Sequence, residues 1–344
     1  MLRPPPTRRT AADEIDRMLT ATRELVEPEL RRAVRALPEP FRLMAGYQLG
    51  WCDASGRADA APTGKMLRPA LLLAAFSAYH DDTARALPAA AAVELLHNFS
   101  LIHDDVMDGD ALRRGRETIW RRWGSTNAIL LGDALHALAT RTLCRCAPES
   151  VTAALALLDR AAIDLCVGQY LDCAFESRPA VGGPEYLRMA EAKTGALLGC
   201  ACALGALCAG TGRSEVTAMD TRGRELGIAF QLIDDLMGLW GDPAVTGKPV
   251  GHDLARRKRS FPVVAAIESG DPAGARLAQR YASPEPWTAA EIAAATALVE
   301  RAGGRERTEA TADARIDAAL ATLPDTPAFA GFRALALFVA HRDR

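Results

Sequence analysis

The chain has 344 residues, of which 49% are hydrophobic, so it is long enough to bury a large core. Its 41 basic and 43 acidic residues leave a formal net charge of −2, which gives no reason to expect nucleic acid or an anionic membrane as a partner. The eight cysteines show no zinc-finger spacing and the N-terminal residues no apolar signal core, so we expect a cytoplasmic protein.

Residues 1–10 are rich in proline and arginine and are expected to form a disordered tail. From residue 11 to residue 344, apolar residues recur at spacings of three and four, and β-branched alternation is nearly absent. This pattern predicts a single all-α domain, a bundle of about ten or more helices. The expected breaks between helices are residues 52–64, 109–116, 176–184, 241–253, 268–272 and 282–287.

The first acidic motif, Asp104, Asp105 and Asp108, lies in an apolar stretch that reads as a helix. At about 100° per residue, His97, Asp104 and Asp108 fall within about 20° of one stripe, whereas Asp105 points about a right angle away. Burying carboxylates is costly unless a cation or hydrogen-bond donors compensate them, so the motif suggests a divalent metal with Asp105 in a supporting role.

Residues 194–212 carry no charge and are near the length of a membrane span. They are mostly small residues, which let helices pack closely. We therefore expect a helix buried inside a bundle and no membrane span.

A second acid pair, Asp234 and Asp235, lies in a similar apolar frame, with Gln231 on the same helix face as Asp234. Glycine stands at position 238, where the first motif has its third acid. A lone motif of this kind could be a solvated helix end, but two copies favour Mg²⁺, which binds through one or two carboxylates together with phosphate oxygens.

Basic residues accompany both motifs. Lys65 and Arg68 open an early helix, Arg113 and Arg114 follow the first motif, and Lys248 and Lys258 follow the second. Arginine and lysine both bind phosphate oxygens. Two groups of cations suit two anionic substrates, or one large one.

The ordered motifs from Gly64 to Pro262 resemble the trans-isoprenyl diphosphate synthases, most closely those that make geranylgeranyl diphosphate. The motifs are GKMLRP, HNFSLIHDDVMD, LRRGRET, ILLGDAL, GQYLD, KTG, FQLIDD and GDPAVTGKPVGHDLARRKRSFP. The resemblance implies an isoprenoid-synthase bundle around a central cavity. It also implies head-to-tail condensation of isopentenyl diphosphate with dimethylallyl, geranyl or farnesyl diphosphate through an allylic carbocation.

The same resemblance implies roles for individual residues. Asp104, Asp108 and Asp234 would hold three Mg²⁺ ions, with Mn²⁺ as an alternative, and Asp105 and Asp235 would support them. Isopentenyl diphosphate would be bound by Lys65, Arg68, His97 and Arg114. The allylic diphosphate would be bound by Arg113, Lys193, Thr194, Gln231, Lys248 and Lys258, and Gln169 would line the prenyl chain. The catalytic set is therefore Asp104, Asp105, Asp108, Asp234, Asp235, Lys193, Thr194 and Gln231.

Residues upstream of the first motif set product length in that family, here Leu96, Phe99 and Ser100. An aromatic residue followed by a small one favours the twenty-carbon product, geranylgeranyl diphosphate, with a farnesyl or longer-chain synthase as the alternative. An ideal helix turns Phe99 about 140° from Asp104, so Phe99 would be a side wall unless the helix deviates. Gly238 is expected to weaken binding of the third Mg²⁺.

Two functions from other classes are weighed against this one. A terpene cyclase also ionises an allylic diphosphate, but it needs no clamp for isopentenyl diphosphate. A non-catalytic regulatory subunit would be expected to lose the first acidic motif, which this chain keeps. The resemblance further implies a homodimer.

Overall fold

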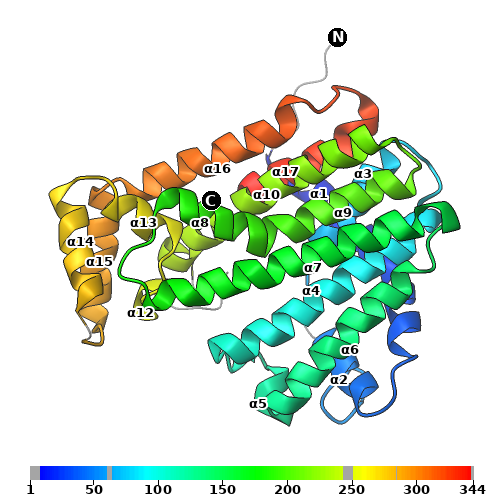
Figure 1. Cartoon of the computed structure of the whole chain (residues 1–344), viewed down its shortest axis with the longest axis horizontal. Helices are drawn as coiled ribbons and strands as arrows, with labels where there is room; N and C mark the ends of the chain where they lie inside the picture. The colour runs from blue at the N-terminus through cyan, green and yellow to red at the C-terminus, as the bar shows by residue number, and fades with distance from the viewer. Residues whose placement is uncertain (1–7, 60–63, 243–250, 284, 342–344) are drawn as a thin grey trace. The chain divides into compact units, whose positions relative to one another are not determined.

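A computed structural model describes residues 8–59, 64–242, 251–283 and 285–341 (Figure 1). Almost all regular structure in these residues is helical, which confirms the all-α prediction. The longer helices are α1 (Arg8–Val34), α3 (Leu67–Ser77), α4 (Leu87–Asp108), α6 (Ser125–Leu143), α7 (Pro148–Ser177), α9 (Ala196–Cys208), α10 (Arg213–Trp240), α14 (Pro272–Ala282), α15 (Ala289–Arg301), α16 (Gly304–Ala321) and α17 (Ala330–His341). The shorter ones are α2 (Phe41–Gln48), η1 (Thr83–Ala86), α5 (Ile119–Trp123), α8 (Gly183–Ala190), η2 (Glu191–Gly195), α12 (His252–Ala255), α13 (Phe261–Ile267) and η3 (Pro327–Phe329).

The chain packs as two compact units. The first comprises Met1–Ala162, Leu197–Gly223 and Pro324–Phe338; the second comprises Ile163–Ala196, Arg224–Leu323 and Val339–Arg344. The expectation of a single domain from residue 11 onward stays a prediction. Helix α1 begins at Arg8, so the last three residues of the expected tail are helical.

Helix α4 carries the first acidic motif in the first unit. Its N-terminal half is built of buried alanine, valine and leucine, and Figure 1 shows it lying along α6. The helix ends at Gly109, whose φ of 67° is the left-handed conformation that terminates helices. The acids of the first motif are thus on the last two turns of a helix whose other end is anchored in the core.

The segment after α4 was expected to be irregular, but it forms a short antiparallel ribbon of β1 (Leu112–Arg113) and β2 (Arg116–Glu117). Its two turn residues, Arg114 and Gly115, have φ values of 53° and 77°. Positive φ at both central positions is the signature of the tight turn that fits the twist of a hairpin. The ribbon directs the two consecutive arginines into different environments.

The uncharged segment that could be mistaken for a membrane span lies largely within α9. The run Gly183–Cys208 is long and apolar enough to cross a membrane, but 78% of its most apolar window is buried within the protein. Gly205 faces α3 so closely that a Cβ there would lie 2.3 Å from the carbonyl oxygen of Leu72. Close packing of this kind is typical of a core helix.

The eight cysteines differ in burial, and Cys52 is intermediate. Cys146, Cys200, Cys202 and Cys208 are buried, as expected for small apolar residues, whereas Cys144, Cys166 and Cys173 are exposed. All eight are free thiols, in line with the absence of a disulfide pattern in the sequence.

Candidate active site

The first acidic motif divides into two half-buried carboxylates and one buried one. Asp104 and Asp108 are one helical turn apart, so both lie on the same face of α4. Asp105 is only 1% exposed. The helix therefore presents Asp104 and Asp108 as candidate metal ligands and turns Asp105 inward.

Arg113 holds the buried Asp105. Its Nε and Nη2 atoms lie 2.8 and 2.6 Å from the same oxygen, Oδ1 of Asp105. Burial raises the pKa of Asp105, although the hydrogen bond and charge of Arg113 oppose this shift. Because charge-assisted hydrogen bonds are strong, the pair fixes the ribbon to the end of α4. This places the predicted diphosphate ligand Arg113 beside the face that carries the candidate metal ligands.

The residues predicted to bind isopentenyl diphosphate all belong to the first unit. Arg68 on α3 has its Nη1 3.1 Å from Nε2 of His97 on α4. Burial and the charges of Arg68, Arg114 and Arg113 lower the pKa of His97 well below its usual value. The imidazole is therefore neutral, and it accepts the hydrogen bond from Arg68. Lys65 lies 5.5 Å from the ring centre of Phe338 in a cation–π contact.

Gly64 fits against the guanidinium group of Arg114. A Cβ at Gly64 would lie 2.9 Å from Nη2 of Arg114, and the carbonyl oxygen of Gly64 accepts a 2.7 Å hydrogen bond from Arg23. The glycine of the GKMLRP motif therefore leaves the space that Arg114 occupies. Sequence reasoning missed Arg23, because its partner is 41 residues away.

Glu94 was also missed. It is 5% exposed on α4, and Asn98 donates a 3.2 Å hydrogen bond to its Oε1. Burial raises the pKa of Glu94, while the charges of Arg68, Arg114 and Arg23 counteract the shift. Glu94 is thus a buried acid surrounded by the arginines of this cluster. The only signal in the sequence is its position one turn before Asn98 in an apolar helix.

In the second unit, two glycines allow three chain segments to come into close contact. A Cβ at Gly168 on α7 would lie 2.2 Å from the backbone nitrogen of Lys193 in η2. A Cβ at Gly227 on α10 would lie 2.4 Å from Cα of Gly195. The η2 segment is a π-helical turn, a feature frequent at functional sites. It presents Lys193 and Thr194 between α7 and α10.

A hydrogen-bond chain links the predicted residues of η2 and α10. Thr194 donates a 2.7 Å bond to Oε1 of Gln231, and Nε2 of Gln231 donates a 3.1 Å bond to Oδ1 of Asp235. Asp235, 2% exposed, also accepts from the hydroxyl of Tyr186 and from the backbone N–H of Phe261. Burial raises its pKa to about 7. Asp235 therefore has a structural role, because it accepts hydrogen bonds from three groups. Asp234 is the half-buried member of the pair.

Asp172 bridges two of the predicted diphosphate-binding lysines. Its Oδ2 lies 2.5 Å from Nζ of Lys193 and 3.5 Å from Nζ of Lys258. Burial opposes ionisation, but the two ammonium groups outweigh it and lower the pKa of Asp172. Asp172 is the last residue of the GQYLD motif. The motif was recognised in the sequence, but no role was predicted for this aspartate. Lys248 lies outside the described residues.

Gln169, in the same motif, is buried and has a spare hydrogen-bond acceptor. Its Nε2 donates to Sγ of Cys173 at 3.6 Å, and its Oε1 has no hydrogen-bond partner among the residues that the structure describes. A buried carbonyl oxygen can stabilise positive charge on a neighbouring group.

Gly238, which replaces the last acid of the second motif, packs against Asp253 of α12. A Cβ at Gly238 would lie 2.2 Å from Oδ2 and 2.6 Å from Cγ of Asp253. The carboxylate of Asp253 therefore occupies the space where a longer side chain at position 238 would begin. The sequence contains the glycine but gives no sign of this neighbour.

The candidate metal ligands fit Mg²⁺ that arrives with a phosphate-bearing substrate. Within the described ranges, no three His, Cys, Asp or Glu side chains are arranged to hold a metal by themselves. Mg²⁺ commonly takes only one or two protein carboxylates and completes its shell with phosphate oxygens and water. Asp104 with Asp108, and Asp234 in the second unit, offer carboxylates of this kind.

The predicted chain-length residues are all buried in α4. Leu96, Phe99 and Ser100 are 0%, 7% and 6% exposed, and the Ser100 hydroxyl donates a 2.8 Å bond to the carbonyl oxygen of His97. Phe99 packs against His136 of α6, which agrees with the helical geometry that turns it away from Asp104. Phe99 is therefore a wall between α4 and α6.

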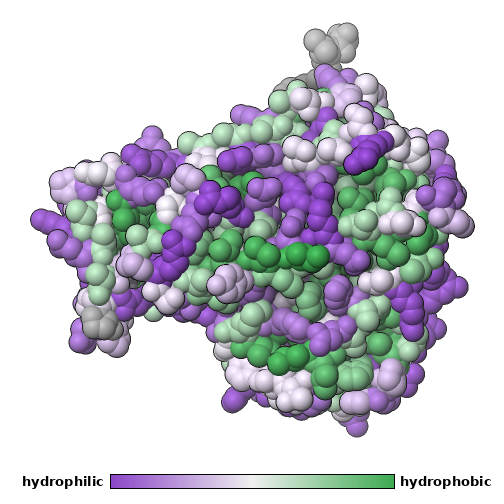
Figure 2. Space-filling view, viewed as in Figure 1, coloured by the Kyte–Doolittle hydropathy of each residue, from purple (hydrophilic) through white to green (hydrophobic). Residues whose placement is uncertain are grey.

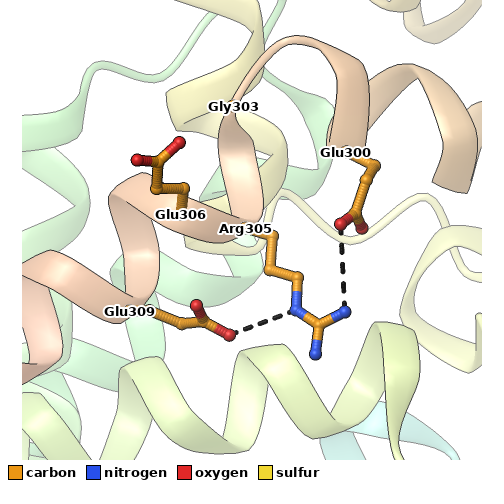
Figure 3. Close-up of a pocket in the computed structure, with 5 residues that line it drawn as sticks. All are labelled: Glu300, Gly303, Arg305, Glu306 and Glu309. Carbon is orange, nitrogen blue, oxygen red and sulfur yellow. Dashed lines mark hydrogen bonds and ion pairs between the residues drawn. The ribbon is translucent and has the colours of Figure 1, made fainter.

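A surface depression of about 290 Å³ in the second unit has no part in this chemistry (Figure 3). It is lined by Glu300, Gly303, Arg305, Glu306 and Glu309. Figure 3 shows Arg305 held between Glu309 and Glu300, at 3.1 and 3.9 Å. It is a surface charge network, and none of its residues is a predicted site residue.

The chain is similar to known proteins over nearly its whole length. Residues 51–299 match the family model described as polyprenyl synthetase. A geranylgeranyl diphosphate synthase of Mycobacterium tuberculosis is 50% identical, over 92% of this chain and 91% of its own. A (2E,6E)-farnesyl diphosphate synthase of Mycobacterium bovis is 42% identical, over 95% of this chain and 93% of its own. The structure of a polyprenyl synthetase from Streptomyces coelicolor has a TM-score of 0.90 and 40% identity, with 94% of this chain and 99% of that chain covered.

Proposed function

Because this chain belongs to the polyprenyl synthetase family, we propose that it condenses isopentenyl diphosphate with allylic diphosphates to make geranylgeranyl diphosphate. The chain is a prenyltransferase, and its relatives include geranylgeranyl and farnesyl diphosphate synthases. Geranylgeranyl diphosphate is the best-supported product, because the relative with that activity is 50% identical and the farnesyl synthase is 42% identical.

The observation that carries this proposal is the presence of two separately organised cation sets. Arg68 and Arg114 belong to the first unit, together with Lys65 and the neutral His97. Lys193 and Lys258 belong to the second unit and share Asp172. We infer that the first set binds isopentenyl diphosphate and that the second binds the allylic diphosphate. Two anionic substrates of different structure account for two clamps of different composition.

We further propose that Mg²⁺ is held by Asp104, Asp108 and Asp234, with three ions bound when both diphosphates are present and Mn²⁺ as a substitute. When bound, the metal would neutralise the diphosphate leaving group and so favour ionisation of the allylic substrate. Asp105 and Arg113 keep the end of α4 and the ribbon together, so that the diphosphate ligands have a fixed position.

The uncharged side chains around η2 would surround the reacting prenyl group. The hydroxyl of Thr194, the amide of Gln231 and the buried Oε1 of Gln169 supply oxygen dipoles suited to a developing carbocation. Thr194 and Gln169 are buried, which helps to exclude water that would otherwise capture the cation. With the metal supplying charge neutralisation, fixed dipoles and positioning complete the catalysis, and no nucleophilic side chain is needed.

We also propose a homodimer in the cytoplasm. Ile163, Val167 and Tyr170 form a stripe along α7 in which the exposed fractions are 65%, 49% and 72%. Figure 2 shows hydrophobic residues exposed along the face of α7 turned to the viewer. In the first unit, Ile129 and Leu130 of α6 are also about half exposed, at 46% and 48%. Large apolar side chains grouped on helix surfaces mark protein–protein contacts.

The test is incubation of the purified protein with isopentenyl diphosphate and, in turn, dimethylallyl, geranyl or farnesyl diphosphate. Reactions are run with Mg²⁺ and with a chelator, and the products are dephosphorylated and weighed by mass spectrometry. Twenty-carbon geranylgeraniol formed only with metal is the expected result. Fifteen-carbon product alone would replace the proposal by a farnesyl synthase. A cyclic hydrocarbon formed without isopentenyl diphosphate, or no reaction with any primer, would refute it.

A further inference from the structure

The π-helical turn η2 is held by one face of α7 and one face of α10, all within the second unit. Residues spaced by three or four lie on the same face of a helix. On α7 the face that meets η2 carries Asp164, Gly168 and Asp172. On α10 it carries Arg224, Gly227 and Gln231. Successive turns of two helices therefore contact η2 from its beginning to its end.

The contacts at the far end of η2 involve the side chains that are proposed to meet the allylic substrate. Lys193 donates to Asp172 on α7, and Thr194 donates to Gln231 on α10. A bound diphosphate and prenyl group would compete for these same side chains. Bonds that the substrate can exchange are poor anchors, so the position of η2 must depend on other contacts as well.

The beginning of η2 is held by Arg224 instead. Nη2 of Arg224 donates a 2.9 Å hydrogen bond to Oδ2 of Asp164 on α7. Nη1 lies 3.6 Å from Oε1 of Glu191, the first residue of η2. One guanidinium group thus joins α10, α7 and η2. A planar guanidinium can serve two carboxylates through different nitrogens, which the point charge of lysine does less well.

The surroundings of Arg224 make these ion pairs more than surface contacts. An isolated exposed pair contributes little, but the Arg224 side chain is only 17% exposed and it forms a network of three charges. The backbone of the same residue is also in contact with η2, since a Cβ at Gly195 would lie 3.0 Å from the carbonyl oxygen of Arg224. Arg224 therefore meets η2 through both its backbone and its side chain.

We propose that Arg224 is a positioning residue for prenyl transfer, because its two ion pairs fix η2 and so keep Lys193 and Thr194 beside the reacting group. This inference rests on the proposed function, since it supposes that Lys193 and Thr194 contact the allylic substrate. The two carboxylates that Arg224 binds, Asp164 and Glu191, are not among the predicted substrate ligands. Arg224 acts on the reaction through the position of η2.

The experiment compares the steady-state kinetics of Arg224→Ala and wild type with Mg²⁺, isopentenyl diphosphate and farnesyl diphosphate. We expect kcat to fall about tenfold or more, since a displacement of about 1 Å in a positioning group can cost about 100-fold. The KM for isopentenyl diphosphate is expected to stay unchanged, because its predicted ligands belong to the first unit. Arg224→Lys keeps the charge and is expected to recover part of kcat.

Glu191→Gln removes one of the two ion pairs with little change of shape and is expected to lower kcat by a smaller factor. It also serves if Arg224→Ala does not fold. The double variant Arg224→Ala/Glu191→Gln should have the kcat of Arg224→Ala, because Glu191 acts through its contact with Arg224.

A matched control is the ion pair at the next residue of α10. Glu225 lies 3.1 Å from Nη1 of Arg315 on α16. Arg315→Ala removes a similar pair from α10 and is expected to leave kcat unchanged. Hydrogen exchange of residues 186–196 in the substrate-free proteins gives a readout that does not depend on activity. Exchange should be faster in Arg224→Ala than in the wild type and unchanged in Arg315→Ala.

Wild-type kcat in folded Arg224→Ala and Glu191→Gln proteins would overturn the inference. So would equal losses of kcat in Arg224→Ala and Arg315→Ala, since the cause would then be a general loosening of α10. Failure of the proposed function is recognised separately, because the wild type would then give no condensation product with any primer. Hydrogen exchange alone would in that case decide whether Arg224 fixes η2.

Discussion

Replacing Gly238 by aspartate would complete the sequence of the second acidic motif. The structure predicts, however, that this change destabilises the protein. The new Cβ would lie 2.2 Å from Oδ2 and 2.6 Å from Cγ of Asp253, well inside van der Waals contact. Either the Asp253 side chain must rotate or the backbone must shift, and two carboxylates would then compete for one place. Overpacking a core costs about 1–3 kcal/mol, and the lower end of this range applies here because the contact is with the end of a half-buried side chain. We expect Gly238→Asp to lower the free energy of unfolding by that amount.

The cause can be isolated by a double variant, Gly238→Asp/Asp253→Ala, which keeps the net charge of the wild type. Removing the Asp253 carboxylate makes room for the new side chain, so most of the lost stability should return. Contacting residues typically show coupling energies of about 0.5–3 kcal/mol in such cycles. Urea unfolding followed by circular dichroism gives the four free energies. Gly212→Asp is a suitable control, since no atom lies within 4 Å of a Cβ built at Gly212.

The double variant also provides the proper test of the third metal. If Gly238 weakens Mg²⁺ binding, Gly238→Asp/Asp253→Ala should reach half-maximal activity at a lower Mg²⁺ concentration than Asp253→Ala. An unchanged Mg²⁺ dependence would contradict the expectation that Gly238 weakens binding of the third Mg²⁺. A double variant as unstable as Gly238→Asp would refute the steric argument.

Three further predictions concern the two cation sets and the surface. Asp172→Asn should cost about 1–3 kcal/mol at neutral pH, because it removes the carboxylate that two half-buried lysines share. Since the folded protein holds the pKa of Asp172 below its unfolded value, this stability is present above the unfolded pKa and lost as pH falls through the folded one. The difference between wild type and Asp172→Asn should therefore shrink in acid unfolding curves, and a constant difference would contradict the ion-pair account. Gly64→Ala should raise the KM for isopentenyl diphosphate several-fold through the 2.9 Å contact with Arg114, more than the KM for the allylic substrate; equal effects on both would count against separate clamps. Val167→Asp should shift the protein toward monomer in sedimentation analysis, and an unchanged mass would argue against the α7 stripe as the dimer contact.

The local features of the fold were predictable from the sequence. Helical periodicity predicted the all-α class and some of the breaks between helices, because the pattern of apolar residues along a helix depends on near neighbours only. It missed others, such as those at residues 144–147 and 209–212. The same geometry separated Asp105 from Asp104 and Asp108, and turned Phe99 away from the acids. The ordered motifs indicated the family, which the comparisons confirmed.

Only the tertiary structure revealed the partners that position those residues. Arg68 meets His97 across 29 residues, Lys193 meets Asp172 across 21, and Tyr186 meets Asp235 across 49. Asp253 beside Gly238 and His136 beside Phe99 are equally invisible in a linear pattern. Such contacts depend on how helices pack, and close packing is decided by the shapes of surfaces that the chain brings together only when folded. The sequence therefore determined which chemical groups the protein carries, and the packing of its helices decided which of them are held, neutralised or left available to a substrate.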